Sequence, residues 1–122
     1  MATRFAPPPK NLDEEGRILW RAIVRTGPLR PDQLELLRHI CATIDLIERL
    51  ESEQRGAPLT VKGSMGQVVS SPLVTEVRQH RALVGQLLGR LRLQSEDTGT
   101  VEARSSREAA LILARARWSK TA

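Results

Sequence analysis

Three arginines recur at every fourth residue near the start of the chain, a spacing that suits phosphate binding. Arg17, Arg21 and Arg25 would line one stripe of a helix, where like charges four residues apart repel one another. A polyanion lying against the stripe would relieve this repulsion, which favours contact with a nucleic-acid backbone. The alternative is a solvated stripe whose charge is balanced by Asp13 and Glu14. The sequence alone leaves both interpretations open.

Other basic residues add candidate contacts further along the chain. Lys62 adjoins a tip, Gly63–Gly66, whose backbone amides could touch phosphates, although a tight turn is the simpler explanation of its glycines. Arg78, Arg81 and Arg92 are expected opposite an apolar seam. The candidate DNA-binding set is Arg17, Arg21, Arg25, Lys62, Arg78 and Arg81. The C-terminal segment, with Arg104, Arg107, Arg115, Arg117, Trp118 and Lys120, is basic and amphipathic; Arg115, Arg117 and Trp118 are its candidate partner-binding residues.

Residues that commonly catalyse reactions or bind metals are few and scattered. Cys41 is the single cysteine, and its place on an apolar row predicts a core position. His39 and His80 have no evident nucleophile to pair with. Asp13 with Arg17, and Asp45 with Arg49, have the spacing of ordinary helix-surface ion pairs. There is no P-loop pattern and no Cys/His cluster with metal-ligand spacing, so we expect no catalytic residue, no metal and no cofactor.

Composition restricts the class of protein. The 122 residues carry 19 Lys and Arg against 14 Asp and Glu, a net charge of +5 that suits acidic partners. Two Trp, one Phe and no Tyr leave few rings for stacking bases, which argues against a single-stranded nucleic-acid binder. A lone cysteine permits no intrachain disulfide and fits a reducing compartment. No apolar run approaches the roughly 20 residues of a membrane span, and no signal peptide is evident, so a cytoplasmic location is expected.

The elements that must position these residues are mostly helices. A proline-rich, mobile arm is expected over residues 1–10, a helical core over 11–93, and a linker and helix over 94–122. A short first helix is expected from near Asn11 to near Thr26, where Gly27-Pro28 predicts a turn, and a second helix from Pro31 to about Gln54. Residues 59–70 resemble a β-hairpin with a glycine-bearing tip, and Ser71-Pro72 predicts the start of a third helix that ends near Leu91. A last helix is expected from Ser105 to about Trp118.

The third helix carries an apolar seam that predicts contact between subunits or with the second helix. The candidate interface residues are Leu73, Val77, His80, Val84, Leu87 and Leu91. Gly85 and Gly89 lie away from this seam. Each glycine costs a helix interior roughly 1 kcal/mol relative to alanine, so another backbone is expected to come close there, more readily a neighbouring helix than DNA.

Taken together, these segments resemble a known family. Leu29-Arg30-Pro31-Asp32, Ala42-Thr43-Ile44-Asp45, Val61-Lys62-Gly63-Ser64-Met65-Gly66-Gln67, Ser71-Pro72-Leu73-Val74 and Leu91-Arg92-Leu93 follow one another in the order found in the small subunit of the terminase of tailed double-stranded DNA phages. The resemblance is to the branch common in phages and prophages of actinobacteria, and it covers residues 11–93 and the closing Ala114-Arg115-Ala116-Arg117-Trp118. The family has a glycine where Arg92 stands here.

The resemblance implies a non-enzymatic packaging factor. Members of this family form homo-oligomeric rings, recognise the packaging start site on viral DNA and deliver it to the large subunit, which carries the ATPase and nuclease. A ring would also bury excess apolar helix surface and multiply weak phosphate contacts. Two alternatives stay open: a small dimeric helix-turn-helix transcription regulator, and a helical adaptor that does not bind nucleic acid.

Overall fold

The described part of the chain, residues 5–95 and 100–119 of a computed structural model, is mainly helical. Its elements are α1 (Glu14–Val24), α2 (Pro31–Arg55), β1 (Thr60–Lys62), β2 (Val68–Ser70), α3 (Pro72–Ser95) and α4 (Val101–Trp118). The prediction of helices with one small hairpin between the second and third is confirmed. Three helices differ in their bounds: α1 begins at Glu14 and ends at Val24, inside its predicted limits; α3 continues past Leu91 to Ser95; and α4 begins at Val101, where the Thr100 side chain accepts the N–H of Ala103 at 3.1 Å. The predicted linker is correspondingly shorter, and residues 96–99 lie outside the described residues.

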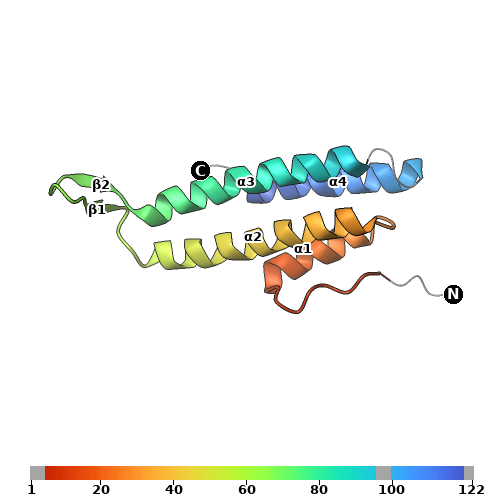
Figure 1. Ribbon diagram of the computed structural model, residues 1–122, viewed down its shortest axis with the longest axis horizontal. Coiled ribbons are helices and arrows are strands. Elements are labelled where there is room, and N and C mark those ends of the chain that lie inside the picture. The colour runs from red at the N-terminus through yellow and green to blue at the C-terminus, as the bar shows by residue number, and fades with distance from the viewer. Residues whose placement is uncertain (1–4, 96–99, 120–122) are drawn as a thin grey trace.

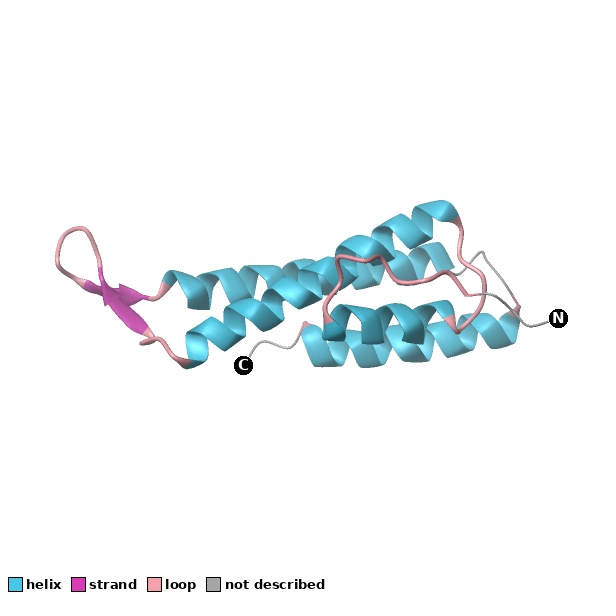
Figure 2. Cartoon of the chain, turned by 90° about the horizontal axis from the view of Figure 1, so that it is seen from below, coloured by secondary structure: helices cyan, strands magenta, loops and turns pink. Residues whose placement is uncertain are grey.

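The helices form a four-helix arrangement at one end of an elongated molecule. α2 and α3 run antiparallel along its length; α1 packs on α2, α4 packs on α3, and α1 also touches α4. At the other end α2 and α3 continue as a two-helix stem that carries the β-hairpin at its tip (Figure 1). The view from below shows the same division, with α1 and α4 side by side and away from the hairpin (Figure 2).

The start of α1 is fixed by a residue of α2. The carboxylate of Asp45 accepts the backbone N–H of Asp13 at 2.7 Å and that of Gly16 at 2.8 Å, so it caps the helix from 32 residues away. Asp45 is buried, and the predicted surface ion pair of Asp45 with Arg49 is therefore wrong. Gly16 makes this approach possible: a methyl carbon there would lie 2.8 Å from the carbonyl oxygen of Cys41.

The turn between α1 and α2 uses its glycine and is held by α4. Gly27 has φ +145°, a conformation that residues with a side chain rarely adopt. The buried guanidinium of Arg107 donates to Thr26 Oγ1 at 2.9 Å and to the carbonyl oxygens of Gly27 and Pro28 at 3.0 and 3.1 Å. Arg107 is therefore a structural clamp between α4 and this turn, not part of an exposed basic segment.

The core runs along α2 and receives one side of each other helix. Its buried apolar residues are Leu12, Leu19, Trp20, Ile23, Val24, Leu37, Ile40, Cys41, Ile44, Ile47, Val84, Leu88, Leu91, Leu111, Ala114 and Trp118. The predicted seam of α3 divides between this core and the surface. Val84 and Leu91 are fully buried within one chain and Val77 nearly so, which corrects their assignment to a subunit interface. Leu73, His80 and Leu87 are only half-buried and form an outer row.

Residues 5–10 do not extend away from the helices. Trp20 Nε1 donates to the carbonyl oxygen of Ala6 at 2.9 Å, and Phe5 and Ala6 border a pocket of about 360 Å³ against the turn at Gly27. The expectation of a free arm does not fit this segment. Residues 1–4 of the predicted arm lie outside the described residues.

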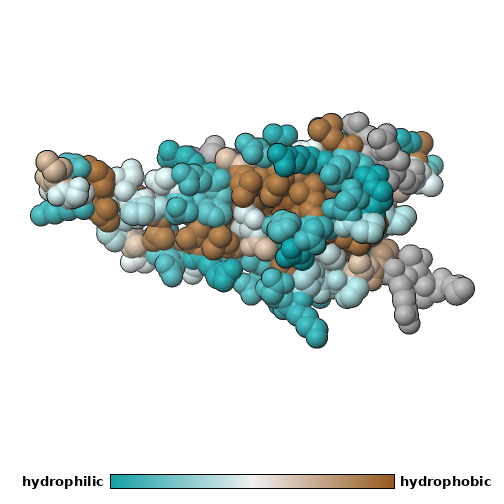
Figure 3. Space-filling view, viewed as in Figure 1, coloured by the Kyte–Doolittle hydropathy of each residue, from teal (hydrophilic) through white to brown (hydrophobic). Residues whose placement is uncertain are grey.

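The β-hairpin is regular but uncovered. Thr60 pairs with Ser70, Val61 with Val69 and Lys62 with Val68, and Gly63 N–H donates to the carbonyl oxygen of Gln67 at 2.7 Å to close the loop. Both strands are exposed throughout. The space-filling view shows apolar side chains on the hairpin and in a second patch at the middle of the molecule (Figure 3).

Candidate nucleic-acid interface

The arginines of α1 form an exposed stripe whose charge is not balanced by neighbouring acids. Arg17, Arg21 and Arg25 are all solvent-exposed, and no ion pair links them to an acidic side chain among the described residues. The apolar side of the same helix, with Leu19 and Ile23, is buried in the core. The packing of α1 thus determines that this stripe faces solvent.

Two of the three acids beside the stripe pair with other helices, while Glu14 stays exposed. Asp13 lies 3.9 Å from the guanidinium of Arg49 on α2, and Glu15 accepts from Arg117 of α4 at 3.0 Å. The predicted pairing of Asp13 with Arg17 is therefore wrong. The alternative interpretation, a solvated stripe balanced by Asp13 and Glu14, therefore loses Asp13.

The other predicted DNA contacts lie at the stem end, away from α1. Lys62 on β1 and Arg78 on α3 are exposed. Arg78 also borders a cleft that includes Arg55 of α2, a cation that the sequence did not single out. Arg81 differs: its guanidinium forms an ion pair with Glu51 of α2 and donates to the carbonyl oxygen of Trp118 at 3.2 Å. Arg81 thus joins three helices, and its assignment to a free DNA-binding face does not fit this position.

The predicted C-terminal partner surface is only partly at the surface. Trp118 is buried in the core, which corrects its assignment to an exposed docking site. Arg117 lies with its guanidinium carbon 4.9 Å from the centre of the Trp118 ring and bridges to Glu15, so it ties α4 to α1. Arg115 stays exposed and borders a groove between α3 and α4. Arg92, at the same groove, pairs with Glu108 at 2.5 Å.

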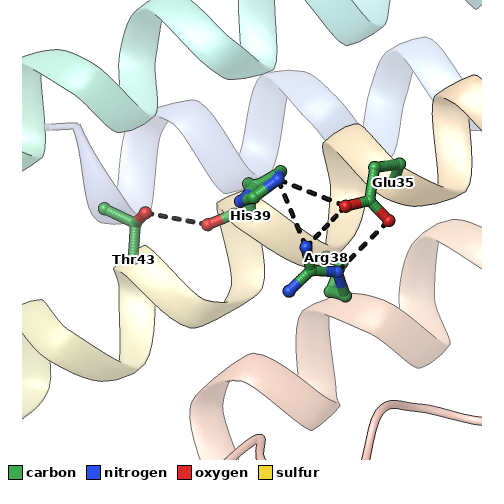
Figure 4. A network of polar contacts seen from close by, with 4 residues as sticks. All are labelled: Glu35, Arg38, His39 and Thr43. Atoms are coloured by element: carbon green, nitrogen blue, oxygen red, sulfur yellow. Dashed lines mark hydrogen bonds and ion pairs between the residues drawn. The ribbon is translucent and has the colours of Figure 1, made fainter.

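The histidines and the cysteine occupy unremarkable positions. His39 belongs to an exposed network on α2 with Glu35 and Arg38, in which Arg38 donates to Glu35 and lowers the pKa of that carboxyl (Figure 4). His80 Nδ1 lies 2.7 Å from the carbonyl oxygen of Glu76, one turn earlier on α3. Burial, with a smaller effect of the Asp45 carboxylate, raises the pKa of the Cys41 thiol, which suits a core residue and not a nucleophile.

Metal binding and membrane insertion find no support in residues 5–95 and 100–119. No cluster of three His, Cys, Asp or Glu side chains there is arranged to hold a metal ion. None of the described helices combines the length and apolar character that crossing a bilayer requires.

The roles of three residues were not predicted from the sequence: Asp45 as a helix cap, Arg107 as a clamp on the turn, and Arg55 as an exposed cation. Asp45 and Arg107 each act on a segment distant in the chain, so no local pattern announces them. Arg55, at the last turn of α2, was detectable because cations are common at helix C-termini.

Comparison with known proteins does not identify a family: no protein-family model, no curated protein and no solved structure matches this chain.

Proposed function

We propose that this chain is a DNA-binding assembly factor, the small subunit of a phage terminase. In this proposal it works in the host cytoplasm, binds the packaging start site on double-stranded viral DNA as a homo-oligomeric ring, and recruits and regulates the large ATPase and nuclease subunit. The chain itself is proposed to catalyse no reaction. The family assignment rests on the segment order described above, from Leu29-Arg30-Pro31-Asp32 to the closing Arg117-Trp118.

The observation that carries the DNA-binding part is the α1 stripe. Three exposed guanidinium groups on successive turns, with Asp13 and Glu15 paired to other helices, leave a local excess of positive charge. Phosphates along duplex DNA can neutralise such a row and release counterions, which gives salt-dependent affinity without base contacts. Repetition of the stripe around an oligomer would multiply this weak contact.

The helix-turn-helix alternative is less well supported by the packing. A recognition helix needs one face free to enter the major groove, whereas α2, which follows the Gly27-Pro28 turn, is covered by α1 on one side and α3 on the other. Its buried residues recur along most of its length, from Gln33 to Ile47. An adaptor without DNA contact would leave the stripe on α1 unexplained.

Native mass spectrometry with and without duplex DNA tests the proposal. We expect masses of several chains for the free protein, and complexes with duplex DNA that dissociate as salt is raised. A monomer that ignores duplex DNA at low salt would overturn the proposal. A dimer that binds only a palindromic duplex would support the transcription regulator instead, and binding to a protein partner with no affinity for DNA would support the adaptor.

A further inference from the structure

The β-hairpin is built largely of exposed apolar residues. Its strands and tip carry Leu59, Val61, Met65, Val68 and Val69, all exposed, with Met65 88% and Val68 73% accessible. Between residues 59 and 70 the only charged side chain is that of Lys62. A lone two-stranded hairpin is marginally stable in water, so this apolar, nearly uncharged element is suited to packing on another apolar surface.

A second observation concerns the two glycines of α3. A methyl carbon at Gly85 would lie 3.1 Å from Ser119 Cβ, so the packing of the C-terminal end of α4 on α3 accounts for that glycine, as predicted. A methyl carbon at Gly89 would meet no atom within 4 Å. Glycine there weakens the helix by roughly 1 kcal/mol relative to alanine, and no contact among the described residues of one chain explains it.

Gly89 forms part of an open apolar groove between α3 and α4. Its walls include Leu88 and Leu111, with Ile112 and Ala116 on α4, and its volume is about 530 Å³. Pockets of about 300–1,000 Å³ are the size that holds a small ligand or a few inserted side chains. Arg92, one of two cations at its margin, is already neutralised by Glu108. The other cation, Arg115, stays exposed, so the groove offers an apolar lining with one exposed charge at its margin.

The hairpin cannot reach the groove of its own chain. It projects from the far end of the stem and points away from α4 (Figures 1 and 2). The groove begins near Leu88, about 24 Å along the axis of α3 from Pro72, where the hairpin ends. The two apolar surfaces can meet only between copies.

We propose that the hairpin of one copy docks into the α3–α4 groove of a second copy, with Met65 at the leading tip. An unbranched thioether side chain adapts to an irregular groove, and a segment whose one charged residue is Lys62 offers little to a strongly charged partner. Two different surfaces meet, so the contact is heterologous, and it forms a ring where the rotation between successive copies closes. This inference rests on the assembly part of the proposed function and names the surfaces that would mediate it.

Two substitutions test the two sides of the contact. Met65→Asp places a charge at the exposed tip, and Gly89→Gln fills the groove; both side chains lie in open space, so neither should lower the melting temperature of the chain. We expect each variant to be a monomer by sedimentation velocity where the wild type is an oligomer. The matched controls are Ser106→Asp, the same charge at an exposed position of α4, and Gly89→Ala, which strengthens the helix but leaves the groove open. Both controls should still assemble.

Mixing the two monomeric variants distinguishes this contact from others. The Gly89→Gln chain keeps an intact hairpin and the Met65→Asp chain an intact groove, so together they should form a 1:1 heterodimer and nothing larger. Assembly that survives Gly89→Gln, or variants that fail to complement, would show that hairpins pair with each other or dock elsewhere and would overturn the inference. A monomeric wild type would also overturn it, and duplex DNA titrated into that same monomer would show whether the proposed DNA binding fails too.

Discussion

Replacing the α1 stripe should separate specific phosphate contact from general positive charge. The triple variant Arg17→Gln, Arg21→Gln, Arg25→Gln removes three of the net +5 charges and leaves +2. If each arginine neutralises one phosphate, the slope of log affinity against log salt falls in magnitude by about 2.7 for each chain in contact with the duplex. Between 50 and 200 mM salt the wild type would then lose about 40-fold more affinity than the variant.

The same substitution should not harm the fold. The three side chains are exposed, and two like-charge pairs at four-residue spacing disappear, which should raise the free energy of unfolding by about 0.4–1 kcal/mol. Chemical denaturation of the variant therefore serves as its folding control. A variant that binds weakly but unfolds no more easily than the wild type has lost a contact and not its structure.

Fluorescence anisotropy of a labelled duplex, titrated at several salt concentrations, measures the slope. The matched control is Arg30→Gln, Arg38→Gln, Arg92→Gln, which also leaves +2 but removes arginines already paired with Asp32, Glu35 and Glu108, none of them an acid of α1. We expect the control to keep most of the salt slope. An unchanged slope in the stripe variant would refute the assignment of α1 to DNA, and an equal loss in the control would show that affinity follows net charge alone.

Four further predictions concern the packing that orients α1 and closes the bundle. Asp45→Ala leaves the N–H groups of Asp13 and Gly16 without their acceptor and should lower the free energy of unfolding by about 1–3 kcal/mol in urea denaturation. Gly16→Ala should lower the melting temperature although alanine favours helix, because the added carbon would lie 2.8 Å from the carbonyl oxygen of Cys41. Arg107→Met should lower the free energy of unfolding by about 1–3 kcal/mol, since Thr26 and the part-buried carbonyl oxygens of Gly27 and Pro28 lose their donor, and amide exchange near this turn should accelerate. Burial raises the pKa of the Cys41 thiol, so a disulfide reagent at mildly alkaline pH should label it only as fast as the chain opens.

Their controls come from exposed positions. Asp32→Ala removes an exposed ion pair with Arg30 and should leave the free energy of unfolding nearly unchanged, so an equal loss for Asp32 and Asp45 would contradict the capping role. Gly89→Ala, in open space, should raise the melting temperature where Gly16→Ala lowers it. Labelling of Cys41 as fast as a free thiol in the folded protein would contradict its burial.

Much of the fold was predictable because its signals are local. Gly27-Pro28 and Ser71-Pro72 mark helix boundaries through backbone geometry that any context preserves, and the β-branched residues around Gly63–Gly66 predict the hairpin in the same way. The apolar seam of α3 was also predicted, but the sequence did not show which of its residues face the core of the same chain and which face outward. Residues seven apart, Val77, Val84 and Leu91, turn toward α2, while Leu73, His80 and Leu87 turn partly outward. When the apolar face of a helix is wide, the sequence does not reveal which of its residues pack within the same chain.

The candidate site was less predictable because the function of an arginine depends on which acid reaches it. Arg81 finds Glu51 and Arg117 finds Glu15, partners 30 and 102 residues away that only the folded bundle brings together. Those two contacts remove cations from any interface, and the second also removes an acid from the first turn of α1. The stripe on α1 gains positive character for the same reason, since Asp13 and Glu15 are bound to other helices and only Glu14 is left to balance it locally. Tertiary ion pairing therefore leaves α1 as the one described helix on which no arginine has an acidic partner among the described residues. For this reason the stripe is the first surface to test for DNA binding.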